Sequence, residues 1–187
     1  YPRTESADLE LAKKLNINAV FIPTVETIYP DDYTYQVQEN NISQILEGVI
    51  RPGHFAGMLT VVLKLLQIIK ATRIYLGEKD YQQLFIIRKM VADLCLPIEI
   101  CSSPTVREPD GLAMSSRNAY LNPEQRQAAT VLYRSLRAAE TAFISDERDA
   151  GVLRQIMTTT IDAEPLARRQ YVSCADPATL HELEGPI

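Results

Sequence analysis

The sequence predicts an α/β fold in its first half and a smaller, more helical second half. Between positions 19 and 101, short apolar runs alternate with long apolar helical stretches, and the pattern changes beyond Pro104 to Gly111. The order strand, helix, strand, helix, strand at this spacing is typical of parallel βαβ units. We therefore expect part of a doubly wound parallel sheet, incomplete because two such units leave sheet edges uncovered. The expected domains are 1–105 and 106–187.

The first half should contain two long helices among its core strands. Residues 5–15 predict a short amphipathic helix, and Ala19-Val20-Phe21-Ile22 predicts a buried strand ended by Pro23. Apolar and polar residues alternate at 33–37, which predicts another short strand. The core pattern then continues as helix 55–70, strand 73–76, helix 80–94 and strand 98–101.

The second half should be an α+β unit. Asp110-Gly111 marks a tight turn. Asn122-Pro123-Glu124-Gln125 is a helix start, with Asn at the cap, Pro at the first position and Gln placed to reach back. One helix should run from there to about 144 and another from 149 to 161, followed by a strand at 170–174.

Composition argues against several classes of function. The 187 residues, 46% of them hydrophobic, suffice for one ordinary core or two small ones. A net charge of -5 argues against nucleic-acid binding. Cys95, Cys101 and Cys174 lack metal-ligand spacing, which predicts free thiols in a reducing compartment. Lys64 and Lys70 interrupt the longest apolar runs, so we expect no membrane span. We also expect no signal peptide.

The first candidate site is Gly77-Glu78-Lys79-Asp80, between a predicted strand and a predicted helix. Ligands of open α/β sheets bind at the carboxyl ends of strands. Gly77 lets a ligand approach the backbone, and Lys79 adds a cation beside N–H groups that favour anions. This suits a phosphate or a ribose. The alternative is structural, because Asp80 and Gln83 are close to a capping box and Lys79 could simply be solvated.

A second candidate is Met114-Ser115-Ser116-Arg117-Asn118, which opens the second half. Two hydroxyls and a guanidinium could bind a triphosphate, with Arg117 donating two parallel hydrogen bonds. From here a mobile lid could close on the sheet. The alternative is a polar loop with capping residues.

A third candidate is Arg51-Pro52-Gly53-His54-Phe55, in which His54 comes just before a helix. The ring could contact a ligand, or it could satisfy a buried carbonyl at the helix entry, which is the commoner role of a lone histidine. The other histidine, His181, lies in a polar stretch and is expected on the surface.

Together and in order, these segments resemble the pantothenate synthetase family, the pantoate–β-alanine ligases. The resemblance is close from position 1 to about 136 and weaker over 137–187. It implies a Rossmann-like N-terminal domain, a smaller C-terminal lid and a cytoplasmic homodimer. The segments that carry it are Tyr1-Pro-Arg-Thr, Tyr29-Pro, Arg51-Pro-Gly-His-Phe, Gly77-Glu-Lys-Asp-Tyr-Gln-Gln-Leu, Ile87-Arg-Lys-Met-Val-Ala-Asp, Pro104-Thr-Val-Arg-Glu and Asp110-Gly-Leu-Ala-Met-Ser-Ser-Arg-Asn.

The resemblance implies an AMP-forming ligase that acts in two steps. The pantoate carboxylate attacks the α-phosphate of ATP, which gives pantoyl adenylate and pyrophosphate. The amine of β-alanine then attacks the acyl adenylate and expels AMP, and Mg²⁺ accompanies the ATP phosphates. The implied partners are pantoate, β-alanine and ATP, with no nucleic acid and no membrane.

By position, the resemblance also implies roles for single residues. Gln83 would hydrogen-bond pantoate, and Val106 would lie by the adenine. Arg51 and His54 match motif residues near the site, and no protein metal ligand is expected. Catalytic donors to the phosphates would be Lys79, Ser115, Ser116 and Arg117. The nucleotide would be lined by Gly77, Glu78, Lys79, Asp80 (near the ribose), Val106, Met114, Ser115, Ser116 and Arg117.

The chain departs from the family pattern in three places. It lacks the HIGH-like segment with two histidines, the upstream glutamine that grips pantoate, and the far C-terminal strand with its Asp-Asn ending. We therefore expect these 187 residues alone to have no ligase activity. Two alternatives stay open: another HIGH-type nucleotidyl transferase, such as one making a dinucleotide, or a non-catalytic module for folding or dimer contacts.

Overall fold

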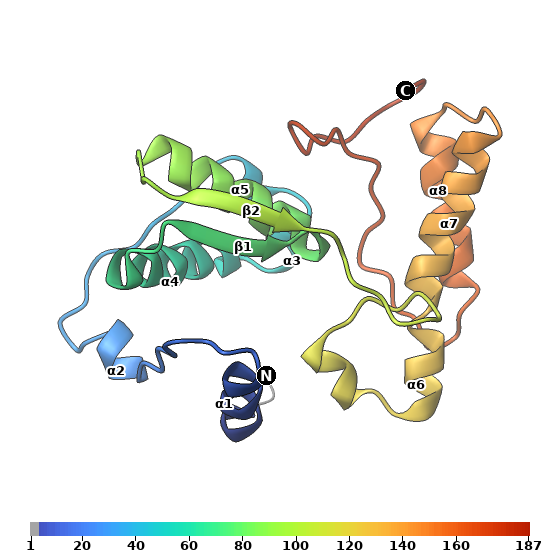
Figure 1. Ribbon diagram of the computed structural model, residues 1–187. Coiled ribbons are helices and arrows are strands. Elements are labelled where there is room, and N and C mark those ends of the chain that lie inside the picture. The colour runs from blue at the N-terminus through green and yellow to red at the C-terminus, as the bar shows by residue number, and fades with distance from the viewer. Residues whose placement is uncertain (1–3) are drawn as a thin grey trace.

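A parallel sheet with a connecting helix forms the centre of the first half, as predicted. The structure, a computed structural model, describes residues 4–187. The first three residues of the segment Tyr1-Pro-Arg-Thr, which is similar to the family, therefore lie outside the described residues. Strand β1 (Arg73–Gly77) pairs in parallel with β2 (Glu99–Ser103) over its whole length. Helix α5 (Tyr81–Asp93) crosses from one strand to the other (Figure 1). The α/β fold class and one βαβ unit are therefore confirmed.

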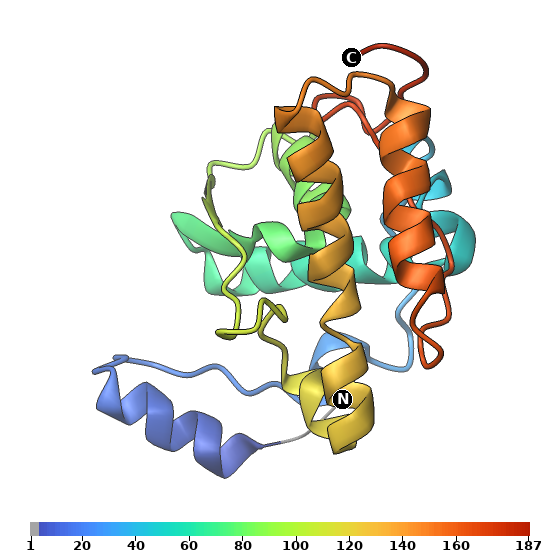
Figure 2. The same ribbon diagram turned by 90° about the vertical axis from the view of Figure 1, so that its right-hand side faces the viewer.

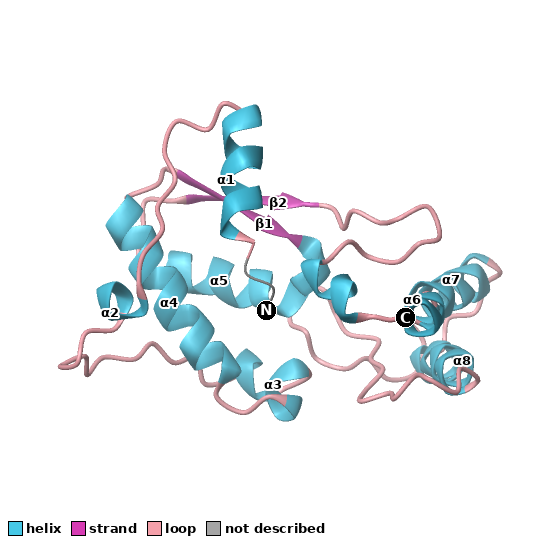
Figure 3. Ribbon diagram, turned by 90° about the horizontal axis from the view of Figure 1, so that it is seen from below, coloured by secondary structure: helices cyan, strands magenta, loops and turns pink. Residues whose placement is uncertain are grey.

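The core of this half lies between the sheet and two helices on one of its faces (Figures 1 and 3). Helix α4 (His54–Ile69) and α5 match the predicted helices 55–70 and 80–94 closely. Tyr75 of β1 is 68% exposed because alternate side chains of a strand point to opposite faces. The sheet is thus packed on one face, and the buried residues there are Phe55, Leu59, Leu66, Ile86, Ile87, Met90 and Val91.

The stretch before α4 forms short helices in place of the predicted strands. Helix α1 (Glu5–Lys14) confirms the helix predicted at 5–15. The buried strand predicted at 19–22 is wrong, since Val20, Phe21 and Ile22 are 50%, 45% and 51% exposed. A strand needs a second backbone to satisfy its N–H and C=O groups, and no described segment pairs with this one. The short helices that follow are α2 (Val25–Ile28), η1 (Ile42–Gln44) and α3 (Glu47–Ile50).

The strand predicted at 33–37 is also wrong. The Val37 N–H donates to Oγ1 of Thr60 on α4 at 2.9 Å, in place of a neighbouring strand. The Val37 side chain packs against the core of α4 and α5. The alternating pattern therefore reflects an extended segment held on a helix by one side chain.

The second half is built on three helices. The predicted capping box is confirmed: Asn122 Oδ1 accepts from the Gln125 N–H at 2.8 Å, and Gln125 Oε1 accepts from the Asn122 N–H at 3.1 Å. The single helix predicted to reach 144 is broken, because Thr130 turns its N–H and its hydroxyl to the Gln127 carbonyl. The helices are α6 (Pro123–Ala128), α7 (Val131–Ile144) and α8 (Ala150–Asp162), which is close to the predicted 149–161. Helices α7 and α8 lie side by side (Figure 2).

The strand predicted at 170–174 is wrong as well. The Cys174 N–H donates to Oε1 of Glu182 at 2.9 Å, and only an isolated bridge joins Ala175 to Glu182. The Cys174 carbonyl does accept from the Leu183 N–H at 2.8 Å, but the Cys174 N–H bonds to a carboxylate, so the backbone pairing does not extend into a strand. The chain then returns to the first half, where the Tyr81 hydroxyl donates to the Pro177 carbonyl at 3.1 Å.

Candidate functional site

A cavity of about 470 Å³ lies where β1 ends, and we name it the sheet-end cavity. Of the residues to which the resemblance assigns a place at the site, all except Glu78 line it, and they come from both halves of the chain. Lys79 and the loop 115–117 therefore meet at one cavity, although they lie in different halves of the sequence. The candidates that line it are Arg51, His54, Gly77, Lys79, Asp80, Gln83, Val106, Met114, Ser115, Ser116 and Arg117.

One side of this cavity, the sheet-side wall, is formed by residues 77–83. A Cβ built on Gly77 would meet no atom within 4 Å, so open space lies beside this backbone. The turn η2 (Glu78–Asp80) then leads into α5. Lys79 Nζ lies 3.2 Å from Asp80 Oδ1, and Asp80 makes no capping hydrogen bond to α5. The capping box that was the structural alternative for Asp80 and Gln83 is therefore not formed.

A second part of the lining comes from the segment 103–117, which we name the loop wall and which folds as a tight hairpin. The Met114 N–H donates to the Val106 carbonyl at 2.9 Å, which brings these two residues side by side. Both are apolar and remain 53% and 64% exposed, respectively. Gly111 turns the hairpin at φ +91°, and a Cβ there would lie 1.9 Å from the Tyr133 ring, so only glycine fits.

The end of the loop wall carries the predicted phosphate donors. Ser115 Oγ accepts from the Arg117 N–H at 3.2 Å and caps the short helix η3 (Ser116–Tyr120). The alternative considered for this segment, a polar loop with capping residues, is thus partly correct for Ser115. Asn118 Nδ2 donates to the Ala113 carbonyl at 3.1 Å and ties the loop together. Capping and cavity lining coexist here, since Ser115, Ser116 and Arg117 all border the sheet-end cavity.

A second cavity of about 370 Å³, the side cavity, adjoins the first. The two share five lining residues. The side cavity adds Glu47, whose Oε1 lies 3.3 Å from Arg51 Nη1, and also Tyr171 and Leu180 from the returning C-terminal segment. Burial and the Glu47 carboxylate raise the pKa of Tyr171. The shared residues are Arg51, His54, Lys79, Asp80 and Gln83.

His54 stands half-buried at the start of α4, at the junction of the two cavities. Burial lowers its pKa first, and the charges of Arg51 and Arg117 lower it further, while Glu47 and Asp80 oppose them. Within residues 4–187, no carbonyl accepts a hydrogen bond from its ring, so the structural role considered for it is not observed. His181 is exposed, as expected.

Gln82 has a structural role that the sequence did not reveal. Its Nε2 donates to the carbonyls of Ile42 at 2.7 Å and Ile45 at 2.9 Å, and its Oε1 accepts from the Glu47 N–H at 3.1 Å. These bonds tie α5 to α3 and place Glu47 at the side cavity. No local pattern indicates such contacts, which span 35 to 40 positions.

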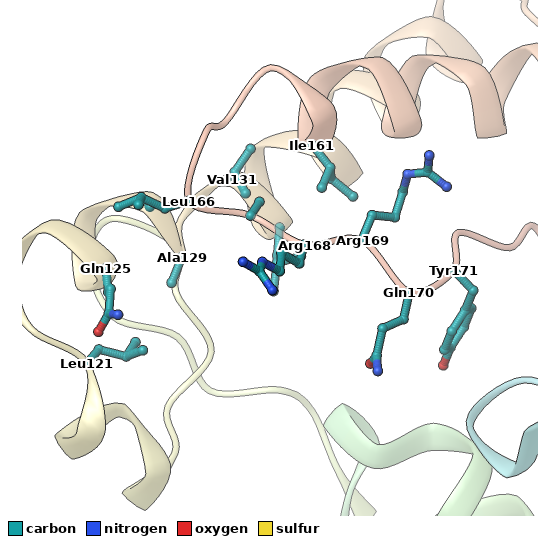
Figure 4. A pocket seen from close by; sticks show the side chains of 13 residues that line it. Leu121, Gln125, Ala129, Val131, Ile161, Leu166, Arg168, Arg169, Gln170 and Tyr171 are labelled. Atoms are coloured by element: carbon teal, nitrogen blue, oxygen red, sulfur yellow. The ribbon is translucent and has the colours of Figure 1, made fainter. Parts of the chain in front are cut away.

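A third cavity, of about 450 Å³, lies between the helices of the second half and the segment 166–171 (Figure 4). Its wall is mainly apolar, with Leu121, Val131 and Ile161 among its residues, and it contains none of the candidate site residues. Among the described residues, no group of three or more His, Cys, Asp or Glu side chains could hold a metal, and no helix is long and apolar enough to cross a membrane. The sheet-end and side cavities, which the candidate residues line, therefore form the candidate functional site.

Comparison with known proteins finds one family along the chain. The family model described as pantoate-beta-alanine ligase matches residues 1–186. The pantothenate synthetase of Chloroflexus aggregans is 52% identical over 100% of this chain and 68% of its own length. That of Chloroflexus aurantiacus is 52% identical over 98% of this chain and 66% of its own length. The chain thus spans about two thirds of the length of these curated relatives.

Solved structures show the same similarity. The crystal structure of pantothenate synthetase from Thermus thermophilus matches with a TM-score of 0.96 at 40% identity, over 100% of this chain and 68% of that one. The pantoate-beta-alanine ligase of Francisella tularensis matches with a TM-score of 0.72 at 39% identity, over 86% of this chain and 59% of that one. The latter was crystallised in complex with beta-gamma ATP and beta-alanine.

Proposed function

This chain belongs to the pantoate-beta-alanine ligase family, and from that premise we propose that it takes part in the ATP-dependent condensation of pantoate with β-alanine. The reaction would proceed through pantoyl adenylate and release AMP and pyrophosphate. One observation carries the proposal: Lys79 and the segment Ser115 to Arg117 line one cavity at the carboxyl end of β1. This is the edge at which open α/β sheets bind nucleotides.

The proposed nucleotide site uses both walls of the sheet-end cavity. The ammonium of Lys79 and the guanidinium of Arg117 would bind the phosphates, together with the hydroxyls of the two serines. The carboxylate of Asp80 would accept a hydrogen bond from a ribose hydroxyl. Val106 and Met114 are apolar and more than half exposed, so a purine ring that covers them would remove apolar surface from water.

The proposed pantoate site lies at Gln83, because this residue borders both cavities. Its amide can donate to the pantoate hydroxyls or carboxylate while the nucleotide occupies the sheet-end cavity. The first step needs no general base, since the nucleophile is already a carboxylate. Negative charge grows on the α-phosphate during attack, and each preorganised donor to such charge is typically worth about 10²–10³-fold in rate.

The Mg²⁺ that accompanies ATP would be held mainly by the phosphates. Magnesium in such sites commonly takes one or two carboxylates plus substrate oxygens. Asp80 offers a carboxylate at the cavity, and no cluster of three or more protein ligands exists among the described residues. The residues present therefore fit a nucleotide-borne magnesium, which would neutralise phosphate charge there.

Enclosure of the adenylate is the proposed task of residues 106–187. An acyl adenylate must be kept from water until the amine arrives. Tyr171 and Leu180 already border the side cavity, and Tyr81 is hydrogen-bonded to Pro177 across the two halves. We take residues 1–105 as the domain on which this second part closes.

The test uses what we call the relative-length enzyme, a chain of the curated relatives' length that contains these residues. It should exchange pyrophosphate into ATP only when pantoate is present, and it should release AMP when β-alanine is added. Pyrophosphate exchange that requires nicotinate mononucleotide in place of pantoate would support the dinucleotide-forming alternative. Absence of ATP binding would support the non-catalytic alternative.

The 187-residue chain by itself should release no AMP under the same conditions. It spans only about two thirds of its relatives, and 19–22 exposes apolar side chains without a pairing strand. Turnover by this polypeptide at the rate of the relative-length enzyme would overturn that expectation. We also propose that the protein is a cytoplasmic homodimer. Light scattering of the relative-length enzyme measures its oligomeric state and so tests whether it is a dimer.

A further inference from the structure

The second step of the proposed reaction needs a proton acceptor that the first step does not need. When the β-alanine nitrogen bonds to the acyl carbon, that nitrogen becomes positively charged and must lose a proton before the amide is stable. The acceptor must lie where the nucleotide and the incoming amine meet. With pantoate held at Gln83 as proposed, the acyl carbon would lie at the junction of the sheet-end and side cavities, which Gln83 borders.

Among the five residues shared by the two cavities, His54 is the one suited to this task. Arg51 and Lys79 carry positive charge at neutral pH and have no proton-accepting capacity there. The Asp80 carboxylate is paired with Lys79 at 3.2 Å, and Gln83 does not ionise. The imidazole of His54 can accept a proton in the physiological range.

The surroundings of His54 favour its neutral form. The charged groups that face it are Glu47 from α3, Arg51 from the turn after α3, Asp80 from η2 and Arg117 from η3. Burial acts first and the two arginines act in the same direction, so the pKa of His54 lies below its ordinary value of 6.5. The neutral ring, which can accept a proton, is therefore favoured.

The hydrogen bonding of His54 also leaves its ring available. No carbonyl in the described part of the chain accepts from it, and its nearest aromatic contact is Phe55, at 5.2 Å between ring centroids. Glu47 is a poorer candidate, because it pairs with Arg51 at 3.3 Å and borders only the side cavity.

We propose that His54 is a catalytic residue that accepts the proton from the attacking nitrogen during amide formation. The inference rests on the proposed function. β-Alanine attacks as the free amine, its ammonium proton having passed to water. The nitrogen lone pair forms the N–C bond, and the C–O bond to AMP breaks with its electron pair on the departing phosphate oxygen. The second proton on nitrogen passes to His54 and then to solvent.

The test compares the two half-reactions in the relative-length enzyme. His54→Gln keeps a polar side chain and removes the base. Pantoate-dependent ATP–pyrophosphate exchange should stay within about threefold of the unsubstituted enzyme. AMP release on addition of β-alanine to the preformed adenylate should slow by about 10²-fold or more, as typical for loss of a general base. His181→Gln replaces the chain's other histidine, which is exposed and borders neither cavity, and should change neither half-reaction.

The pH profile separates a proton acceptor from a structural residue. The free-amine fraction of β-alanine falls with pH in every variant, so His54 is reported by an additional fall. In the unsubstituted enzyme, the rate of amide formation should gain this additional acid limb as pH drops through the lowered pKa of His54, below 6.5, because the protonated ring cannot accept. His54→Gln should lose this limb of the profile. Hydroxylamine, whose bound nitrogen gives its proton to water readily, should release AMP from the variant at a rate much closer to that of the unsubstituted enzyme.

Three results would overturn the inference. One is an unchanged amide-forming rate in His54→Gln. Another is an equal loss of both half-reactions in His54→Gln and also in His54→Asn, since a structural defect would act on both. A third is that the additional acid limb, beyond the fall caused by protonation of β-alanine, persists in the variant. If the unsubstituted enzyme shows no pantoate-dependent exchange, the proposed function itself fails, which is a separate outcome.

Discussion

The two walls of the sheet-end cavity are held in place by different physical means. The sheet-side wall, residues 77–83, continues into α5, where Leu84 and Ile87 are 1% and 0% exposed. The loop wall, 103–117, is held by its own hydrogen bonds, such as that from the Met114 N–H to the Val106 carbonyl, and by contacts with α6 and α7, such as the ion pair of Asp110 with Arg126. Packing in a close-packed core resists displacement more than a surface hairpin does. We infer that the first wall positions the phosphates and the second can close on them.

Lys79→Ala should have the largest effect, because it removes a cation from the sheet-side wall. If Lys79 stabilises charge on the α-phosphate, adenylate formation should slow by about 10²–10³-fold. The side chain is exposed, so the melting temperature should hardly change. The measurement is pantoate-dependent ATP–pyrophosphate exchange in the relative-length enzyme.

The matched control is Lys89→Ala, further along α5. Lys89 is also exposed and pairs with Asp93, a type of contact worth at most about 1 kcal/mol. It borders neither the sheet-end nor the side cavity, so the exchange rate should be unchanged. Near-normal exchange in Lys79→Ala would remove Lys79 from the proposed mechanism.

Arg117→Ala tests the loop wall and should have the next largest effect. Because closure of the loop depends on its phosphate contacts, both the KM for ATP and the exchange rate should worsen, with kcat/KM lower by about 10²-fold. Arg137→Ala on α7, where the arginine pairs with Glu140 at the surface, is the control and should behave normally. An unchanged KM and rate in Arg117→Ala would contradict a phosphate role for this loop.

Patterns of neighbouring residues were enough to predict the sheet-side wall. The apolar runs of α4 and α5 and the breaks at Gly53 and Gly77 place two helices and the end of β1 nearly where the structure has them. The turn at Gly111 and the capping box at Asn122 also depend on neighbouring residues. Such features are readable because the sequence that forms them is continuous.

Features that depend on distant partners were not predictable. The apolar run 19–22 has the composition of a strand, yet no described backbone pairs with it. Glu47, Tyr171 and Leu180 enter the side cavity only because α3 and the C-terminal segment fold back on α5. The local sequence of a segment does not indicate which distant surface that segment will contact.

Gln82 and Gln83 are adjacent, yet we predict opposite effects for them. Gln82→Ala leaves the Ile42 and Ile45 carbonyls and the Glu47 N–H without their partner, which should cost about 1–3 kcal/mol of unfolding free energy. Gln83→Ala removes a cavity-lining amide, so it should raise the KM for pantoate with little loss of stability. Urea unfolding and pantoate titration separate the two. A stability loss in Gln83→Ala equal to that in Gln82→Ala would contradict this division.

Val106→Ala should have the smallest effect and sharpens the distinction between the walls. Val106 is 64% exposed, so its truncation should leave folding unchanged and act only when a purine covers it. Loss of about 1 kcal/mol of apolar contact corresponds to a rise of roughly fivefold in the KM for ATP. Val49→Ala is a closely matched control, since Val49 is 63% exposed on α3 and borders neither the sheet-end nor the side cavity. If both variants bind ATP alike, the adenine does not rest on the loop wall, and closure would have to depend on the phosphate contacts of Ser115, Ser116 and Arg117.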